Sequence, residues 1–357
     1  EMTIKVSAPG RICLFGEDQD YMGLSVITAA INLRTYIEGN YSNRDKISID
    51  LLDIRQKDDF YYDELPNYRK KRDYLRSGFN ILKRKGFELS KGLSCKIWSK
   101  LPIGAGLSSS SVLVVAWIKF LSELFNLNLN PEKIADLAYQ AEVVEFKEKG
   151  GNMDHFASAL GYGMFMECIT PPHIEKIDLD SIKNSFVIGD TCEKKKTLQT
   201  HNVRRAEFDE GIRLIKHHIP DFDLKITPIS KVEKFLRHLP RNPSKRLWAL
   251  LQVRDVVTMA KDELSKNNPD AVHIAELIDL HHNAMRDGLE NSTPKIEKII
   301  YETKNAGALA GKIVGSGNGG CVVIFCPDNQ QKIANVINHR CNGKAYIVDI
   351  DEGIKKY

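Results

Sequence analysis

The feature that most constrains this chain is a glycine- and serine-rich stretch between a strand-like run and a long apolar run. Residues 102–112 read PIGAGLSSSSV, and the apolar run that starts at residue 112 continues at helical spacing to Phe125. Residues 93–98, just before the stretch, have the pattern of a strand. Gly104 and Gly106 let the backbone turn tightly and approach a ligand closely, because they carry no Cβ. The stretch therefore predicts a loop that opens a buried helix.

A loop of this kind is suited to binding phosphate. The first N–H groups of a helix have no partner within the helix, and they lie at the positive end of its dipole. The stretch does not match the Walker pattern, because no Lys-Ser or Lys-Thr pair follows Gly106. An ordinary tight turn with a serine N-cap is the alternative for the loop taken alone.

The composition is that of a globular protein large enough for two domains. The chain has 357 residues, of which 42% are hydrophobic and 27% charged. Its net charge of +4 is spread along the sequence, which argues against nucleic acid but does not hinder an anionic substrate. The seven cysteines are scattered without a Cys-x-x-Cys pair, and no apolar run reaches about 18 residues. We therefore expect a cytoplasmic protein with reduced thiols and no membrane partner.

An acidic turn follows the first apolar run. Residues 12–15 are apolar, and residues 16–23 then bring three acids, Glu17, Asp18 and Asp20, between two glycines. Acids so close to a buried strand favour a polar pocket over a solvent loop. A turn with solvated carboxylates is the alternative.

The remaining pattern alternates strands and helices. In the first half we expect a turn at 8–11, strands at 26–31, 35–41 and 46–52, and a loop at 53–66. We also expect helices at 68–85 and from Pro131 to about residue 148, the second with Asn130 as its N-cap. In the second half we expect a lysine-rich polar segment at 194–196, helices at 200–217, 231–238, 244–266, 271–289, 293–305 and 330–340, and a last strand at 345–350. Residues 311–325 read as strand, glycine loop and strand, which fits either close backbone contact with a ligand or a plain glycine-rich hairpin.

A Gly-Gly-Asn-Met-Asp sequence at 150–154 ends the helix that starts at Pro131. An Asp after two glycines is most often a helix cap, so Asp154 alone would be weak evidence for a catalytic base.

Taken together, these segments resemble the three motifs of the GHMP kinase superfamily, which includes galactokinases and mevalonate kinases. The resemblance covers nearly the whole chain, and its best match is galactokinase. Galactokinases carry Gly-Arg and then Gly-Glu-His-x-Asp-Tyr, and this chain has GR at 10–11 and GEDQDY at 16–21. They also carry an Ala-Glu pair and, twelve residues after the Glu, an Asp, as Glu142 and Asp154 do here. The chain departs from the family at Asp18, which replaces a His, at His155, which replaces a Gln, and at Arg72, which replaces a Trp.

The resemblance implies an α+β fold of two domains. Residues 1–185 would form an N-terminal ATP-binding domain similar to ribosomal protein S5 domain 2. Residues 186–357 would form a C-terminal ferredoxin-like domain, with the substrate in the cleft between the two.

The resemblance also implies an ATP- and Mg²⁺-dependent kinase that phosphorylates the anomeric hydroxyl of a monosaccharide. Asp154 would be the base and Arg11 the catalytic arginine, with Ser110 and Glu142 holding the metal. Substrate contacts would come from Glu17, Asp18, Asp20, Gly151 and Gly317. ATP would be bound by Pro102, Gly104, Ala105, Gly106, Leu107, Ser108, Ser109 and Ser110. Ser99, Lys100 and residues 61–62 are candidates for the adenine pocket.

Among the acidic residues of this turn, Asp18 is the one that most affects which substrate we expect. A carboxylate accepts hydrogen bonds but cannot donate them, unlike the family's His, and it would repel a carboxylated or phosphorylated sugar. Two alternatives remain open: a mevalonate-type kinase, and a non-catalytic galactokinase-like sugar sensor. The sequence also leaves open whether the protein is a monomer or a dimer.

Overall fold

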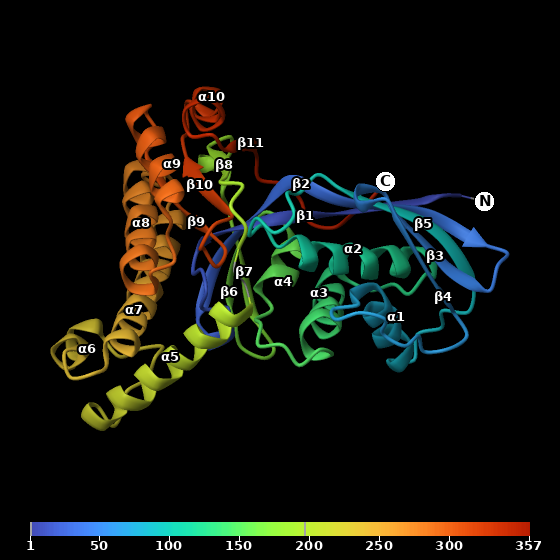
Figure 1. The fold of residues 1–357 in the computed structure, drawn as a ribbon, viewed down its shortest axis with the longest axis horizontal. Helices are drawn as coiled ribbons and strands as arrows, with labels where there is room; N and C mark the ends of the chain where they lie inside the picture. Colours follow the sequence, from blue (N-terminus) through green and yellow to red (C-terminus); the bar gives the residue numbers. More distant parts are fainter. Residues whose placement is uncertain (1, 196–197) are drawn as a thin grey trace.

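The computed structural model describes residues 2–195 and 198–357, and it contains two β-sheets (Figure 1). The larger sheet has the strand order β12-β1-β2-β5-β3-β4, with β6 paired to β2 and β7 to β6. Its strands are β1 (Ile4–Phe15), β2 (Ser25–Ser42), β3 (Lys46–Leu51), β4 (Gln56–Tyr61), β5 (Gly92–Ser99), β6 (Gly163–Glu167), β7 (His173–Ile177) and β12 (Lys355–Lys356). Among the described strands of this sheet, β3 and β5 pair in parallel and the other pairs are antiparallel.

The smaller sheet is antiparallel throughout, with the order β11-β8-β10-β9. Its strands are β8 (Phe186–Asp190), β9 (Ala310–Val314), β10 (Cys321–Phe325) and β11 (Lys344–Val348). The fold is thus a mixed one with two sheets, as expected. The division at residues 185 and 186 stays a prediction. β8 begins directly after it, but β12 returns from the end of the chain to pair with β1.

The strands expected at 26–31 and 35–41 are one continuous strand, β2, and two further expectations for the larger sheet are wrong. Residues 8–11 form no turn, because β1 runs through them with a register shift between Pro9 and Arg11. Proline cannot donate to the ladder, and the irregularity accommodates it. Residues 53–66 are not all loop, since β4 pairs with β3. Only Phe60 of this polar edge strand is buried, so the strand has no hydrophobic alternation to reveal it.

Four helices pack beneath the larger sheet in Figure 1, in two layers. They are α1 (Tyr74–Arg84), α2 (Ser109–Leu124), α3 (Pro131–Tyr139) and α4 (Met153–Leu160). α2 and α4 contact β1 and β2, while α1 and α3 pack against α2. Asn130 caps α3 through a hydrogen bond from the Lys133 N–H, as expected, but α3 passes into a π-turn at Gln140–Val144 instead of continuing to residue 148.

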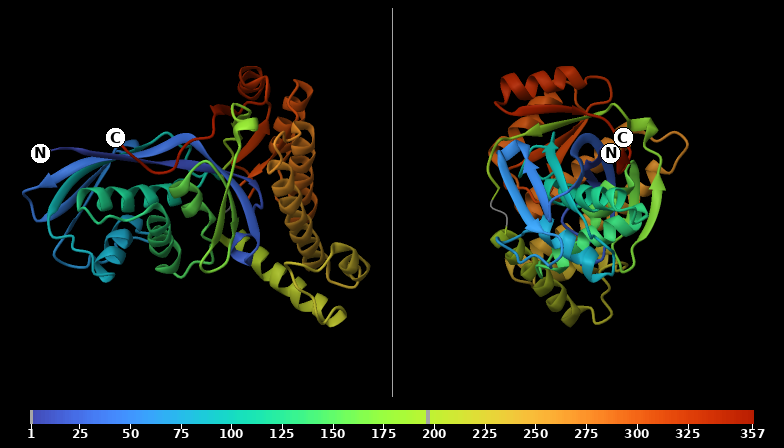
Figure 2. Two further views of the ribbon diagram at one scale, coloured as in Figure 1. Left: turned by 180° about the vertical axis from the view of Figure 1, so that it is seen from behind. Right: turned by 90° about the vertical axis from the view of Figure 1, so that its right-hand side faces the viewer.

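The second half supplies the remaining helices. They are α5 (Leu198–His218), α6 (Ile229–Leu236), α7 (Arg241–Leu264), α8 (Ala271–Asn283), α9 (Pro294–Asn305) and α10 (Gln330–Arg340). α8, α9 and α10 cover the smaller sheet (Figure 2). The polar segment expected at 194–196 reaches Lys196, which lies outside the described residues. One continuous hydrophobic core joins the two sheets, and a smaller one joins α5, α6 and α7.

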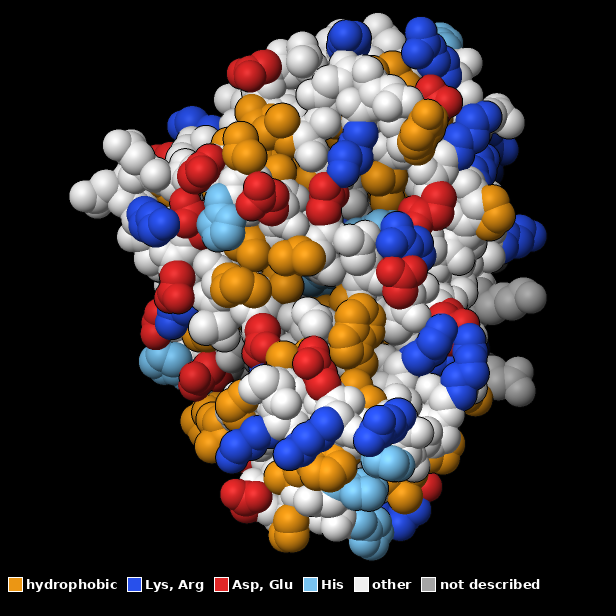
Figure 3. Space-filling view, turned by 90° about the vertical axis from the view of Figure 1, so that its left-hand side faces the viewer, with side chains coloured by type: hydrophobic (Ala, Val, Ile, Leu, Met, Phe, Trp, Pro, Cys, Tyr) orange, Lys and Arg blue, Asp and Glu red, His pale blue; other side chains and the backbone are white. Residues whose placement is uncertain are grey.

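The end of the molecule that carries these helices shows no field of a single charge. Figure 3 shows Lys and Arg side chains intermixed with Asp and Glu over this face. Within residues 2–195 and 198–357, no helix is both long and apolar enough to cross a bilayer. The cytoplasmic location stays a prediction.

Trp117 offers a test of this core. Its side chain is fully buried on α2, donates a hydrogen bond of 2.9 Å to the carbonyl of Leu75, and stacks on Phe120. Trp117→Ala should lower the free energy of unfolding by about 3–5 kcal/mol, because it leaves a large cavity. Urea denaturation followed by circular dichroism measures this. Tyr301→Ala, at a side chain 65% exposed, is the control and should change it by less than about 0.5 kcal/mol. Equal losses of unfolding free energy for Trp117→Ala and Tyr301→Ala would contradict the burial of Trp117 in this core.

Candidate active site

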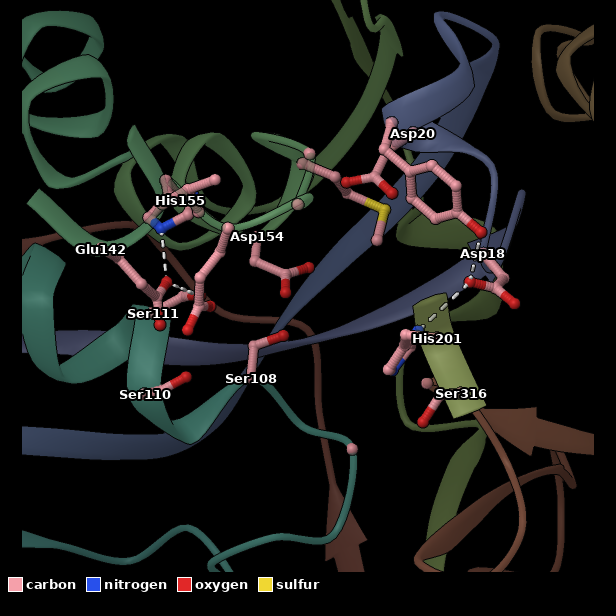
Figure 4. Close-up of a pocket in the computed structure, with 18 of the residues that line it drawn as sticks. Asp18, Asp20, Ser108, Ser110, Ser111, Glu142, Asp154, His155, His201 and Ser316 are labelled. Carbon is pink, nitrogen blue, oxygen red and sulfur yellow. Dashed lines mark hydrogen bonds and ion pairs between the residues drawn. The ribbon is translucent and has the colours of Figure 1, made fainter. Parts of the chain in front are cut away.

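A cavity of about 380 Å³ lies where the first turn of α2, the start of α4, the acidic turn after β1 and the loop between β9 and β10 meet. Figure 4 shows Glu142, His155 and Ser110 at one end of it, Asp154 and Ser108 in the middle, and Asp18 and His201 at the other end. The cavity thus brings together residues that are far apart in the chain and that the sequence predicted to act together. The lining includes Arg11, Glu17, Asp18, Asp20, Gly104, Gly106, Ser108, Ser109, Ser110, Glu142, Gly151, Asp154, Lys195 and His201.

Arg11 and Asp154 form an ion pair at the centre of this cavity, in which Arg11 is buried and Asp154 is partly exposed to the cavity. Arg11 Nε donates to Asp154 Oδ1 at 2.7 Å, and its Nη1 donates to the carbonyl of Gly106 at 3.0 Å. Arg11 follows the irregularity in β1, and Asp154 lies in the first turn of α4. Burial would raise the pKa of Asp154, but the charge and hydrogen bond of Arg11 hold it below its ordinary value. Asp154 is therefore ionised at neutral pH.

The phosphate-loop prediction rests on the start of α2. Gly104, Gly106 and Ser108 all have positive φ, at 70°, 90° and 63°. The side chain of Ser108 makes no cap hydrogen bond, so the serine N-cap of the alternative interpretation does not form. Instead, Ser108 lies beside Asp154 (Figure 4). The first helical bond runs from the Val112 N–H to the Ser108 carbonyl, so the preceding serine N–H groups have no intrahelical partner at the cavity.

Not every residue of the predicted sites lines the cavity. Ala105 and Leu107 are 3% and 1% exposed and belong to the core, and Pro102 also lies outside the lining. Gly317 is likewise absent from the lining, and its missing Cβ makes room for Asn291. Gly151 does line it, and a Cβ there would lie 2.0 Å from Asp20 Oδ2. Gly151 therefore admits the Asp20 carboxylate.

Glu142, Ser110 and Ser111 bring oxygen atoms together at one end of the cavity. Glu142 lies in the π-turn after α3, and its Oε1 accepts from Ser111 Oγ at 2.5 Å and approaches His155 Nε2 at 2.6 Å. Burial opposes ionisation, but these hydrogen bonds lower the pKa of Glu142. A buried carboxylate and the exposed hydroxyl of Ser110 are hard oxygen donors that fit Mg²⁺, which takes its other ligands from phosphate and water.

Glu17 connects the acidic turn to the loop between β9 and β10. Its Oε1 accepts from the Gly315 N–H at 2.8 Å and lies 3.5 Å from Lys312 Nζ. His281 of α8 receives the N–H groups of Gly16 and Glu17 on Nε2, at 3.0 and 3.2 Å. Sequence reasoning missed both His281 and Lys312. His281 lies in a helix without a motif, and Lys312 lies in the strand that begins the segment at 311–325, whose glycines alone were given a role. Only the tertiary packing brings the two side chains to Glu17.

Asp18 is neutralised within the protein. Its carboxylate accepts from Arg204 Nη1 at 2.7 Å and from the Tyr21 hydroxyl at 3.0 Å. His201 Nδ1 lies 3.9 Å from it, also from α5. The repulsion of anionic substrates expected from Asp18 is therefore largely offset by Arg204. The sequence did not connect Arg204 with Asp18, because the two residues are far apart in the chain.

A second, apolar cavity of about 300 Å³ adjoins the first and shares Ser109 and Ser110 with it. Its walls include Ile54, Ile97, Ile103 and Leu113, together with Tyr74 and Ser99. Of the adenine-pocket candidates, Ser99 lines it, and Lys100 and residues 61–62 do not. The apolar residues come from several strands, helices and a loop, so no single stretch of sequence signals this cavity.

Comparison with known proteins gives consistent matches. Residues 73–162 match the GHMP kinases N terminal domain, residues 261–343 the GHMP kinases C terminal domain, and residues 2–40 the galactokinase galactose-binding signature. A mevalonate kinase of Thermococcus onnurineus is 29% identical, over 99% of this chain and 98% of its own. A galactokinase of Actinobacillus succinogenes is also 29% identical, over 92% of this chain and 86% of its own.

Solved structures share the fold. Lactococcus lactis galactokinase complexed with galactose superposes with a TM-score of 0.86 at 23% identity, covering 100% of this chain and 96% of its own. Methanococcus jannaschii mevalonate kinase gives a TM-score of 0.74 at 21% identity, covering 98% of each chain.

The electrostatics of Asp20 can be tested by pH. Burial, and then the Asp154 and Asp18 carboxylates, raise the pKa of Asp20 to about 7. Because this exceeds the unfolded value of about 3.9, protonated Asp20 stabilises the fold at acidic pH, and that contribution is lost as the pH rises through about 7. Asp20→Asn mimics the protonated acid. Its unfolding temperature, relative to wild type, should therefore rise between pH 5 and pH 8. Asp221→Asn, at an exposed side chain, should show no such trend. A difference between Asp20→Asn and wild type that does not change with pH would contradict the raised pKa.

Proposed function

Because the chain belongs to the GHMP kinase family, whose members are ATP-dependent phosphotransferases with an alcohol acceptor, we propose that it phosphorylates the anomeric hydroxyl of a monosaccharide. The observation that carries this proposal is the Arg11–Asp154 ion pair in the cavity, beside the loop at the start of α2. A pure sugar sensor has no need of such a pair, which makes turnover the better account.

The proposed chemistry uses Asp154 as the base. The acceptor hydroxyl gives its proton to the Asp154 carboxylate as its oxygen forms a bond to the γ-phosphorus, and the bond to the ADP oxygen breaks. Arg11 keeps the carboxylate ionised and orients it through the 2.7 Å hydrogen bond. The free N–H groups at the start of α2 would hold the phosphates. Mg²⁺ at Glu142 and Ser110 would neutralise phosphate charge.

The second cavity is the proposed site of the adenine. Its isoleucine and leucine walls fit a flat, largely apolar ring system, and it shares Ser109 and Ser110 with the phosphate end of the first cavity. A nucleotide could therefore extend from one cavity into the other around the start of α2.

The acidic turn favours a sugar as the acceptor. Glu17, Asp18 and Asp20 all line the cavity, and carboxylates are good acceptors for the many hydroxyl donors of a monosaccharide. The match of residues 2–40 to the galactose-binding signature supports the same choice. Mevalonate is the second candidate, because a mevalonate kinase matches 99% of the chain. Its carboxylate would have to lie near Asp20, although Arg204 already offsets the charge of Asp18.

An acceptor screen separates the two candidates. Unfolding temperatures are measured with a panel of monosaccharides and with mevalonate, each with a non-hydrolysable ATP analogue, and the ligands that stabilise are then tested by ADP release. We expect a monosaccharide to raise the unfolding temperature and to support ADP release. If mevalonate supports ADP release and none of the monosaccharides does, the sugar proposal is rejected.

Asp154→Asn tests the base. Asparagine keeps the shape but cannot accept the proton, so kcat should fall by about 10²–10⁴-fold while ATP binding changes little. Coupled ADP release and calorimetric ATP titration measure the two. Asp180→Asn, at a side chain 81% exposed, is the matched control. A kcat of Asp154→Asn within a few-fold of wild type would show that Asp154 is not the base.

A further inference from the structure

Lys195 lies where the two glycine loops meet. A Cβ added to Gly106, in the loop before α2, would lie 2.6 Å from Lys195 Nζ, and one added to Gly315, after β9, would lie 3.0 Å from it. At Gly320, before β10, an added Cβ would lie 2.2 Å from Lys195 Cε. All three glycines have positive φ. Three positions on two loops therefore leave space for this one side chain.

Lys195 also lines the cavity, next to the reacting centre. Gly106, against which its Nζ lies, is the residue whose carbonyl accepts from Arg11 Nη1. Lys195 thus approaches the loop from the second half of the chain, whereas Arg11 approaches it from β1. Two cations converge on one turn of backbone.

Arg11 and Lys195 differ in how their charges are balanced by neighbouring acids. The charge of Arg11 is matched by Asp154 at 2.7 Å, so the pair as a whole is close to neutral. The nearby acids are held by other groups, since Glu17 lies 3.5 Å from Lys312 Nζ and Asp18 lies 2.7 Å from Arg204. Burial lowers the pKa of Lys195, and Arg11 adds to this, while Glu17 acts in the opposite direction. A multiply charged anion bound at the loop would compensate the buried ammonium.

We propose that Lys195 is a catalytic residue that binds the transferring phosphate of ATP. The inference rests on the proposed kinase function. In phosphoryl transfer, charge spreads over the equatorial oxygens of the transferring group, and a fixed cation stabilises it without reorganisation. The Lys195 ammonium lies against Gly106, whose carbonyl accepts from Arg11, so it is available for this purpose at the phosphate loop. Because Lys195 comes from the second half of the chain, it completes the phosphate site only when both halves are packed.

The decisive comparison is between Lys195→Met, which keeps the length but removes the charge, and Lys194→Ala at the exposed neighbouring residue. We expect kcat of Lys195→Met to fall about 100-fold or more, the size found when one preorganised group is removed from a charged transition state. The acceptor KM should change by less than about threefold, because the ammonium acts on the phosphate. Lys194→Ala should behave as wild type. A kcat of Lys195→Met within about threefold of wild type would overturn the proposal.

Nucleotide affinities distinguish phosphate binding by Lys195 from two other roles: linking the loops, and binding the acceptor. Calorimetry should show that Lys195→Met weakens a non-hydrolysable ATP analogue more than ADP, because only the analogue carries a γ-phosphate. An equal loss for both nucleotides together with a lower unfolding temperature would mean that Lys195 only links the loops. A raised acceptor KM with kcat unchanged would assign it to the acceptor. Either result overturns the proposal. If Lys195→Met does not fold, Lys195→Gln and Lys195→Arg replace it, and the arginine variant should retain more activity than the glutamine variant.

The same experiments keep this inference apart from the proposed function. The proposed function fails if the wild-type protein does not release ADP when any monosaccharide of the panel, or mevalonate, is supplied as the acceptor. The ratio of analogue to ADP affinity in Lys195→Met still tests Lys195 in that case. If wild type is active and Lys195→Met is equally active, only the inference about Lys195 fails.

Discussion

The ion pair between Arg11 and Asp154 holds three parts of the site together. It joins β1 to α4, and through the Gly106 carbonyl it also joins both to the loop before α2. Removing Asp154 would leave the buried Arg11 charge without this partner, a change that typically costs about 3–5 kcal/mol in buried pairs. The pair therefore fixes the geometry of three elements and keeps a carboxylate ionised where an acceptor hydroxyl would lie.

A second set of contacts ties the two sheets to this centre. Glu17 binds the Gly315 N–H, His281 receives the N–H groups of Gly16 and Glu17, and Arg204 of α5 pairs with Asp18. Each bond runs from the acidic turn of the first half to an element of the second half. The shape of the acceptor end therefore depends on how the two halves pack, and so would the position of Lys195.

Motif spacing predicted much of this site, because glycines and acids at fixed intervals are local signals. The loop before α2, the cap at Asn130 and the neighbourhood of Asp154 and Arg11 could all be expected from the residues and the family they resemble. The partners of these residues could not. Arg204, His281 and Lys312 reach the acidic turn only through tertiary contacts. The strand β4 was missed because its polar sequence buries Phe60 alone, and the continuous β1 because Pro9 and Gly10 favour a turn locally.

We propose that this site delivers a phosphate to the anomeric oxygen of a sugar held by the acidic turn. Phosphorus NMR of the product can decide this, because the coupling of the phosphorus to a proton identifies the phosphorylated carbon. We expect a sugar phosphate whose phosphorus couples to the anomeric proton, formed with one equivalent of ADP. Phosphate on any other sugar hydroxyl, or on the primary alcohol of mevalonate alone, would contradict it.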